Sequence, residues 1–111
     1  FQRASYFTKI LPHPTGAREA VAGVLAIARN VSIPFGAPYE GFGLYNTEYR
    51  TVADLTNRRY FFELTTAPSV LWVEFDELDF SDSDRCLVID PADVSLAGDV
   101  TKAMAVAELP F

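Results

Sequence analysis

The chain has 111 residues, 50% of them hydrophobic, and nine Lys and Arg against fifteen Asp and Glu give it a formal net charge of −6. This length fits one domain with enough apolar side chains for a core, and the acidic balance argues against a nucleic-acid partner, which clustered cationic side chains would bind. The sequence contains no run of about 18 apolar residues, so we expect neither a membrane-spanning helix nor a membrane partner.

Two helices are predicted before any strand. Residues 1–11 form the first, which ends at Pro12 because proline lacks an amide donor and restricts the residue before it. Residues 17–29 form the second, whose start Thr15 or Gly16 can cap. An apolar stripe with the helical period runs along this second helix, at Val21, Val24, Leu25 and Ala28. We expect both helices to cover the sheet that follows.

A long connection rich in proline and glycine follows the second helix, over residues 30–45. Connections of this length without secondary structure are often functional or contact a partner. This one carries four aromatic residues: Phe35, Tyr39, Phe42 and Tyr45. Two interpretations are open. The rings either pack on the flank of their own domain, or some of them line a substrate pocket or a subunit interface.

Three consecutive strands are predicted over residues 49–53, 60–64 and 70–75, where β-branched and aromatic residues concentrate. Asp and Asn in residues 54–58 favour a hairpin turn, because their side chains bond to the local backbone and they tolerate the left-handed region. Pro68 breaks the ladder before the third strand. In that strand the faces alternate, with Leu71, Val73 and Phe75 on one side and Val70, Trp72 and Glu74 on the other. The result is an antiparallel meander.

The last part of the chain gives fainter patterns. Residues 76–84 are acidic but lack the glycine and the closing glutamate of a helix-loop-helix calcium site, so they predict a solvated connection. Residues 86–89 are expected to form a short strand. A turn is expected at 97–99, and either a short helix or an extended tail at 100–107.

No catalytic constellation is recognisable from the residues alone. Cys86 is the single cysteine, which excludes an internal disulfide and a multi-cysteine metal site, and its apolar neighbours predict a buried thiol. His13 lies between two prolines and is expected to be an exposed loop residue. Arg50, Arg58 and Arg59 are interpreted as solvated or locally paired. Because the chain has no nucleotide-binding glycine fingerprint and no Gly-x-Ser-x-Gly elbow, we expect no cofactor.

Six stretches occur in a characteristic order and spacing: FQRASY at 1–6, EAVAGV at 19–24, RNVSIPFG at 29–36, TEYRTVAD at 47–54, YFFE at 60–63 and VLWV at 70–73. Together they resemble the C-terminal part of the choloylglycine hydrolase family, which comprises bile salt hydrolases and penicillin V acylases. The resemblance weakens past Phe80. At 49–52 and 70–73 the sequence is more similar to the Gram-negative branch of the family.

The resemblance implies an α+β fold that is part of the αββα sandwich of N-terminal-nucleophile hydrolases, with two helices followed by an antiparallel meander. Residues 1–111 would be the C-terminal part of a larger αββα domain. The implied reaction is hydrolysis of a linear, non-peptide amide by an N-terminal cysteine, whose own α-amino group is the base. That cysteine would lie in an upstream segment of the same enzyme, so the isolated chain is expected to be inactive. A homotetramer is also implied and, for the Gram-negative branch, a periplasmic location.

No catalytic residue of this chain follows from the resemblance. Arg3 and Arg50 are supporting candidates at most, and Phe35 and Tyr39 are candidates for substrate binding. The acyl group of the small-molecule amide substrate stays open among bile acid conjugates, phenoxyacetyl penicillins and N-acyl homoserine lactones. The alternative is an autonomous, non-catalytic α+β interaction module whose aromatic loop, residues 35–45, binds a partner.

Overall fold

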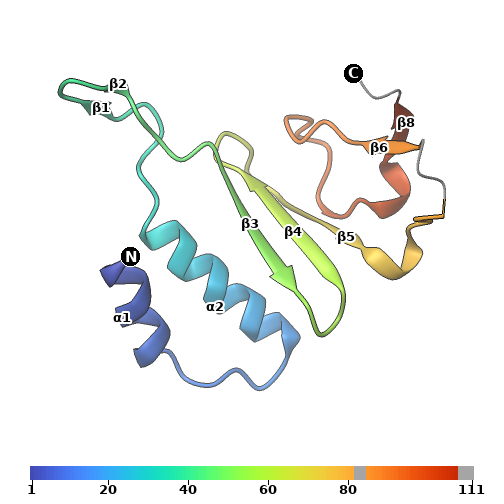
Figure 1. Ribbon diagram of the computed structural model, residues 1–111, viewed down its shortest axis with the longest axis horizontal. Coiled ribbons are helices and arrows are strands. Elements are labelled where there is room, and N and C mark those ends of the chain that lie inside the picture. Colours follow the sequence, from blue (N-terminus) through green and yellow to red (C-terminus); the bar gives the residue numbers. More distant parts are fainter. Residues whose placement is uncertain (82–84, 108–111) are drawn as a thin grey trace.

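The fold is α+β, as the sequence predicts. A computed structural model describes residues 1–81 and 85–107. Two helices, α1 (Gln2–Ile10) and α2 (Ala17–Asn30), come first, and strands follow (Figure 1). The strands and 3-10 turns are β1 (Pro38–Tyr39), β2 (Gly43–Leu44), β3 (Tyr49–Asp54), β4 (Arg59–Leu64), β5 (Val70–Glu74), η1 (Phe75–Glu77), β6 (Cys86–Val88), β7 (Gly98–Asp99), η2 (Thr101–Ala103) and β8 (Ala105–Ala107).

The central element is a sheet with the strand order β3-β4-β5-β7. Its first three strands form the predicted antiparallel meander, and each agrees with its predicted range to within one residue at either end. The fourth strand is unexpected, because β7 pairs with β5 in parallel, through Leu71–Gly98 and Trp72–Asp99. The prediction of a turn at 97–99 is therefore wrong. Gly98 has a φ of +79° there, and a Cβ on it would lie 3.4 Å from the Trp72 ring.

The core lies between α2 and one face of this sheet. Val52, Phe61 and Trp72 are paired across β3, β4 and β5, and Leu25 of α2 packs against this row. Leu25, Val52 and Phe61 are 6%, 8% and 8% exposed, and burial of each such side chain contributes about 1.5–3 kcal/mol. The apolar stripe predicted on α2 thus faces the core, although Val24 within it remains exposed.

The first helix does not lie on the sheet. It packs alongside α2 (Figure 1), and none of its residues is buried. The prediction that both helices cover the meander is therefore wrong for α1, whose large side chains, such as Tyr6 and Ile10, are exposed. Among the residues that the structure describes, no helix combines the length and the apolar character needed to cross a membrane.

The turn between β3 and β4 is held by the Asp54 side chain, as predicted. Its carboxylate accepts hydrogen bonds from Asn57 Nδ2 at 2.7 Å and from the Asn57 backbone N–H at 3.1 Å. These bonds hold the pKa of Asp54 below its ordinary value. The residue in the left-handed region is Arg58, with a φ of 53°, whereas the sequence pointed to Asp or Asn for that conformation.

Ion pairs connect the end of this meander to nearby surface residues: Arg58–Asp76 at 3.0 Å, Arg59–Glu74 at 2.7 Å and Lys102–Glu77 at 3.3 Å. Both arginines are therefore locally paired, as interpreted from the sequence. The acidic residues 76 and 77 belong to η1 and are exposed. Residues 82–84 of the predicted acidic connection lie outside the described part of the chain.

The connection between α2 and β3 contains a small hairpin, so the prediction of a segment without secondary structure is wrong. β1 and β2 pair antiparallel and project away from the main sheet (Figure 1). The Phe42 N–H donates to the Tyr39 carbonyl at 3.0 Å, and Gly41 has a φ of +82°, a conformation that glycine adopts without steric cost. The four aromatic residues are exposed. Within the described residues they therefore do not pack on the flank of the sheet, and the interpretation that some line a substrate pocket or a subunit interface stays a prediction.

The C-terminal part of the chain packs beside β5. β6 pairs with β8 in a separate two-stranded sheet, which confirms the short strand predicted at 86–89. Residues 100–107 contain both predicted alternatives, a 3-10 turn followed by an extended strand. Val100 and Thr101, at 3% and 7% exposure, are well buried. Cys86 is half-buried, rather than buried as predicted.

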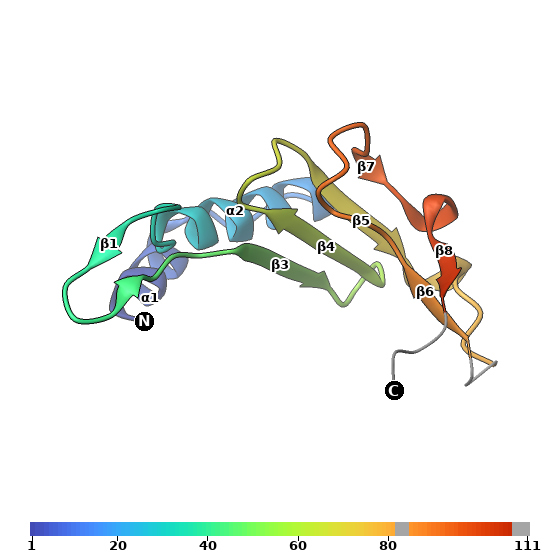
Figure 2. The same ribbon diagram turned by 90° about the horizontal axis from the view of Figure 1, so that it is seen from above.

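The sheet face opposite α2 is only partly covered. It carries the other set of alternating residues, including Tyr49, Tyr60, Phe62 and Leu71. Tyr49 and Phe62 stack with their ring centroids 5.5 Å apart, yet Tyr49 is exposed. In Figure 2 the helices lie on one side of β3 and β4, and no element of the described residues covers the other side of β3. A stable sheet of this kind buries its apolar faces against further layers.

Thr101 provides a test of how the C-terminal part is joined to the sheet. Its Oγ1 accepts the Glu74 N–H at 2.9 Å and donates to Asp99 Oδ1 at 2.6 Å. Thr101→Val keeps the shape but leaves the Glu74 N–H without its acceptor, so the free energy of unfolding should fall by about 1–3 kcal/mol in a urea titration. Thr101→Ser keeps the hydroxyl, so its free energy of unfolding should fall clearly less. Equal losses in the two variants would contradict this role.

The same contact predicts a pH dependence. Hydrogen bonds from the Thr101 hydroxyl and N–H hold the pKa of Asp99 below its ordinary value. Stability that depends on this carboxylate is present above its unfolded pKa of about 4 and is lost as the pH falls through the lower folded pKa. The difference in unfolding free energy between the unmodified protein and Thr101→Val should therefore narrow below about pH 4, as followed by urea titrations at several pH values.

Candidate functional site

A charged cluster joins α2 to the sheet and contains Arg50, one of the predicted supporting residues. Arg50 lies directly opposite Glu63 in the β3–β4 register, with Nη1 3.4 Å from Glu63 Oε2. Arg29, in the last turn of α2, donates to Glu63 Oε1 from Nε at 3.0 Å and from Nη2 at 2.8 Å. One carboxylate thus bonds two guanidinium groups. The side chains of Arg50 and Glu63 are each only 13% exposed.

The cluster is held by hydrogen bonds and ion pairs between charged groups. Hydrogen bonds between ionised groups are stronger than neutral ones, and Arg29 donates three to the Glu63 carboxylate. The hydrogen bond to Glu63 raises the pKa of Arg29 above its ordinary value. Two positive charges against one negative charge leave a surplus positive charge at the C-terminal end of α2. This surplus interacts favourably with the negative end of the helix dipole.

Ser32 extends the cluster into the connection that follows α2. Arg50 Nε donates to Ser32 Oγ at 2.7 Å, and Ser32 Oγ donates to the Ala28 carbonyl at 2.7 Å. The guanidinium of Arg50 therefore forms an ion pair with Glu63 of β4 and donates a hydrogen bond to Ser32 at the same time. Its fork of rigid donors suits such a double contact, which a lysine would not reproduce.

Three residues close the base of the connection, and we call them the neck: Ile33, Thr47 and Thr65. The Ile33 N–H donates to Thr47 Oγ1 at 3.0 Å, and the Thr47 N–H donates to the Ile33 carbonyl at 3.2 Å. Thr65 Oγ1 donates to the Thr47 carbonyl at 2.6 Å. The neck therefore fastens both ends of the connection to each other and to the end of β4.

Beyond the neck, residues 35–45 form what we call the aromatic hairpin. Phe35 and Tyr39, the two predicted substrate-binding candidates, belong to it and are exposed. Tyr39 and Tyr45 meet edge to face with their ring centroids 6.1 Å apart. The structure thus brings two of the predicted site residues, Phe35 and Tyr39, to one connection and places a third, Arg50, at its base. Arg3 lies apart on α1, exposed and outside the contacts described for this cluster.

The thiol and the imidazole of the chain do not form a catalytic pair. His13 lies exposed on the connection between α1 and α2, as predicted, whereas Cys86 lies on β6 at the other end of the molecule (Figure 1). The contact found for the Cys86 thiol within the described residues is with the Leu87 carbonyl, at 4.0 Å. The described residues also contain no group of three or more His, Cys, Asp and Glu side chains that would hold a metal ion.

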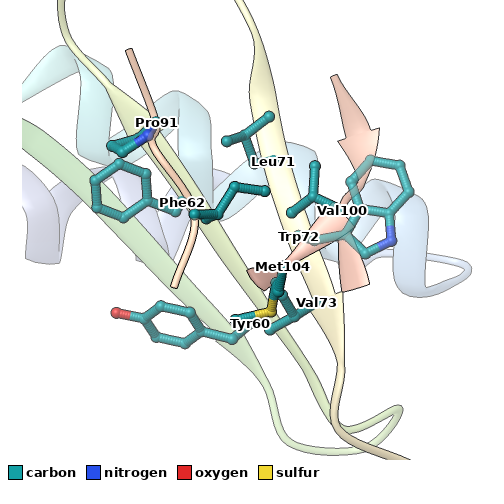
Figure 3. A pocket seen from close by; sticks show the side chains of 9 residues that line it. Tyr60, Phe62, Leu71, Trp72, Val73, Pro91, Val100 and Met104 are labelled. Atoms are coloured by element: carbon teal, nitrogen blue, oxygen red, sulfur yellow. The ribbon is translucent and has the colours of Figure 1, made fainter. Parts of the chain in front are cut away.

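Two of the cavities among the described residues lie outside this cluster. One, of about 230 Å³, lies against the sheet face opposite α2, and Figure 3 shows its apolar lining, which includes Phe62, Leu71, Val100 and Met104. The other, of about 670 Å³, lies between α1 and α2 and is lined in part by His13 and Glu19. The first lining contains no cysteine, serine or threonine, and in the second the Thr8 hydroxyl donates to the Ala4 backbone carbonyl at 2.9 Å. Neither cavity therefore has the residues of a catalytic centre.

Several members of the site were missed from the sequence. Glu63 was predicted only as a strand residue. The predicted turn at 54–58 nevertheless sets the register of the two strands and places Glu63 opposite Arg50, so this ion pair could have been predicted. Arg29 was predicted only as the last residue of the second helix. Ser32, Thr47 and Thr65 carry no sequence signal of their contacts, because each contact depends on how the connection folds back to β3 and β4.

Comparison with known proteins identifies one family. The family model described as "Linear amide C-N hydrolases, choloylglycine hydrolase family" matches residues 1–89. A penicillin V acylase of Pectobacterium atrosepticum is 32% identical over 62 residues, a stretch that covers 55% of this chain and 16% of that protein. The solved structure of a penicillin V acylase from Agrobacterium tumefaciens matches with a TM-score of 0.82 and 28% identity, covering 97% of this chain and 36% of that one.

These matches confirm the family resemblance and the fold class predicted from the sequence, part of an N-terminal-nucleophile hydrolase sandwich. The structural match includes nearly the whole chain, whereas the family model ends at residue 89. Residues 90–107 therefore share the fold of the solved acylase, although the family model does not include them. The chain spans 36% of the length of the solved acylase from Agrobacterium tumefaciens. Its match to the acylase of Pectobacterium atrosepticum spans 16% of the length of that protein.

Glu63 tests the charged cluster. Glu63→Gln removes the negative charge shared by Arg29 and Arg50 and leaves the largely buried Arg50 uncompensated, so the free energy of unfolding should fall by about 2 kcal/mol. The measurement is the shift of the urea midpoint. Lys102→Gln is the control, because it removes an ion pair in which the lysine side chain is 88% exposed and should cost less than about 1 kcal/mol. Similar losses would show that the cluster does not fasten α2 to the sheet.

Proposed function

The chain belongs to the choloylglycine hydrolase family of linear amide C-N hydrolases, and we propose that it forms the C-terminal part of a penicillin V acylase or a conjugated bile acid hydrolase. The observation that carries the proposal is the structural match to a penicillin V acylase over 97% of this chain, at 28% identity. The family match over residues 1–89 supports it independently of the structure.

The proposed chemistry is that of an N-terminal cysteine located outside residues 1–111. Its thiolate attacks the amide carbonyl carbon, the C–N bond breaks, and the amine leaves with the proton that the cysteine's α-amino group had taken up. Water then hydrolyses the thioester, which releases the carboxylic acid and restores the thiol. Hydrogen-bond donors near the carbonyl stabilise the tetrahedral oxyanion in both steps. The proposed reaction uses no cofactor or metal ion.

The surroundings of Cys86 support a nucleophile outside residues 1–111. Cys86, the single cysteine of the sequence, lies within a strand, and its described contact is with a backbone carbonyl. A cysteine nucleophile needs a neighbouring base or cation to form its thiolate, and the described surroundings of Cys86 provide no hydrogen bond to one. We therefore assign Cys86 a structural role.

The proposed contribution of this chain is scaffold and pocket wall. α2 and the meander form one helical layer and one sheet of the αββα sandwich, and the open sheet face would pack on the second sheet of the same domain. The aromatic hairpin would line the entrance to the substrate site, because its rings are exposed and offer an apolar surface for an acyl group. Phe35 and Tyr39 are then the substrate-contacting candidates.

The enzyme that contains this chain should hydrolyse penicillin V to phenoxyacetic acid and 6-aminopenicillanic acid, as measured by chromatography. Glycine-conjugated bile acids and N-acyl homoserine lactones are assayed beside it to identify the preferred acyl group. Replacement of the N-terminal cysteine by alanine should lower kcat at least about a thousandfold, because it removes the nucleophile.

Two controls accompany this measurement. Cys86→Ser in the same enzyme should leave kcat within about threefold, since the thiol is not the nucleophile. The isolated chain, residues 1–111, should release no product above the uncatalysed rate. Turnover by the isolated chain, or a loss of activity in Cys86→Ser as large as that of the N-terminal variant, would sink the proposed assignment of the nucleophile.

A further inference from the structure

The aromatic hairpin depends on its neck for its direction. β1 and β2 contribute two residues each, and its ring-bearing side chains are exposed. A two-stranded ribbon this short is not stable by itself in water. At its base, by contrast, Ile33 and Thr47 exchange two hydrogen bonds, and Thr65 bonds the Thr47 carbonyl at 2.6 Å. The neck is therefore where the connection is ordered.

Arg50 contacts the base of the same connection on the side of α2. Its Nε bonds Ser32, the residue before Ile33, while its Nη1 faces Glu63. Because the Arg50 side chain is only 13% exposed, it has little freedom to move, and Ser32 is held between Arg50 and the Ala28 carbonyl at the end of α2. The point at which the chain leaves the helix is thus fixed relative to the sheet.

We propose that Thr47 and Arg50 are positioning residues that set the fit of the substrate by fixing the direction of the aromatic hairpin. Neither residue touches the reacting atoms, and each acts through the hairpin. The inference rests on the proposed function in one respect, namely that the aromatic hairpin contacts the substrate. The ordering of the hairpin rests on the hydrogen bonds of the neck alone, so it has a readout that does not require activity.

Amide hydrogen exchange of the whole enzyme tests the ordering. Thr47→Val keeps the volume but removes the acceptor of the Ile33 N–H, so peptides that cover residues 34–46 should exchange about tenfold faster, the effect of one lost hydrogen bond. Thr47→Ser restores the hydroxyl and should restore the exchange rate. Thr51→Val is the matched control, because Thr51 lies close by on β3, is exposed, and has no side-chain hydrogen bond among those described.

Kinetics test the effect on the substrate. In Thr47→Val, KM for the preferred amide should rise about three- to tenfold while kcat stays within about twofold, because the lost interaction stabilises bound substrate and transition state alike. Thr47→Ser should recover KM. Ser32→Ala removes the acceptor of Arg50 Nε and should shift exchange and KM in the same direction, which keeps the proposal testable if Thr47→Val folds poorly.

The outcomes are distinguishable. Unchanged exchange of residues 34–46 in both Thr47→Val and Ser32→Ala would overturn the positioning role. Faster exchange with an unchanged KM would overturn the link to substrate fit. An enzyme that hydrolyses none of the amides would refute the proposed function, and the exchange rates would then decide alone whether Thr47 and Arg50 position the hairpin.

Discussion

A sheet has two faces, and the structure depends on how each is kept from water. On one face, Val52 and Phe61 pack against Leu25 of α2, which gives the molecule its small core. On the other face, Tyr49 and Phe62 stack on each other but remain partly open to solvent. A layered fold resolves this with a second sheet. The match to an acylase that is considerably longer than this chain is consistent with a further layer of that kind.

The charged cluster solves a different problem, which is to fix the end of a helix above a strand. Apolar packing is not directional, so it sets how close α2 lies to the sheet without setting its rotation or its end. Glu63 adds direction, because Arg29 from the helix and Arg50 from the neighbouring strand both bond it. The same arginine then reaches Ser32. These contacts therefore fix the start of the connection that leads to the aromatic hairpin relative to α2 and the sheet.

The elements that the sequence predicted best are those set by local patterns. The alternation in 70–75 and the Asp-Asn turn in 54–58 depend on neighbours a few residues away, and both are present in the structure. The errors involve long-range contacts. Gly98 has the composition of a turn, yet it pairs in parallel with Leu71 far earlier in the chain. The neck was not foreseen for the same reason, since Thr47 and Thr65 meet only when the meander has formed.

The same distinction explains why the family could be recognised while the catalytic residues could not be assigned in this chain. Recognition used the order of stretches that build helices and strands, and these are spread along the whole scaffold. Nucleophilic catalysis needs a few atoms at one place, and much of its rate advantage comes from holding them in the correct geometry, where a shift of about 1 Å can cost a factor of about 100. Under the proposed assignment, in which the nucleophile lies outside residues 1–111, this chain would still contribute to that geometry. The proposed contribution is to fix the direction of the aromatic hairpin, and the hydrogen bonds of Thr47 and Arg50 are suited to it.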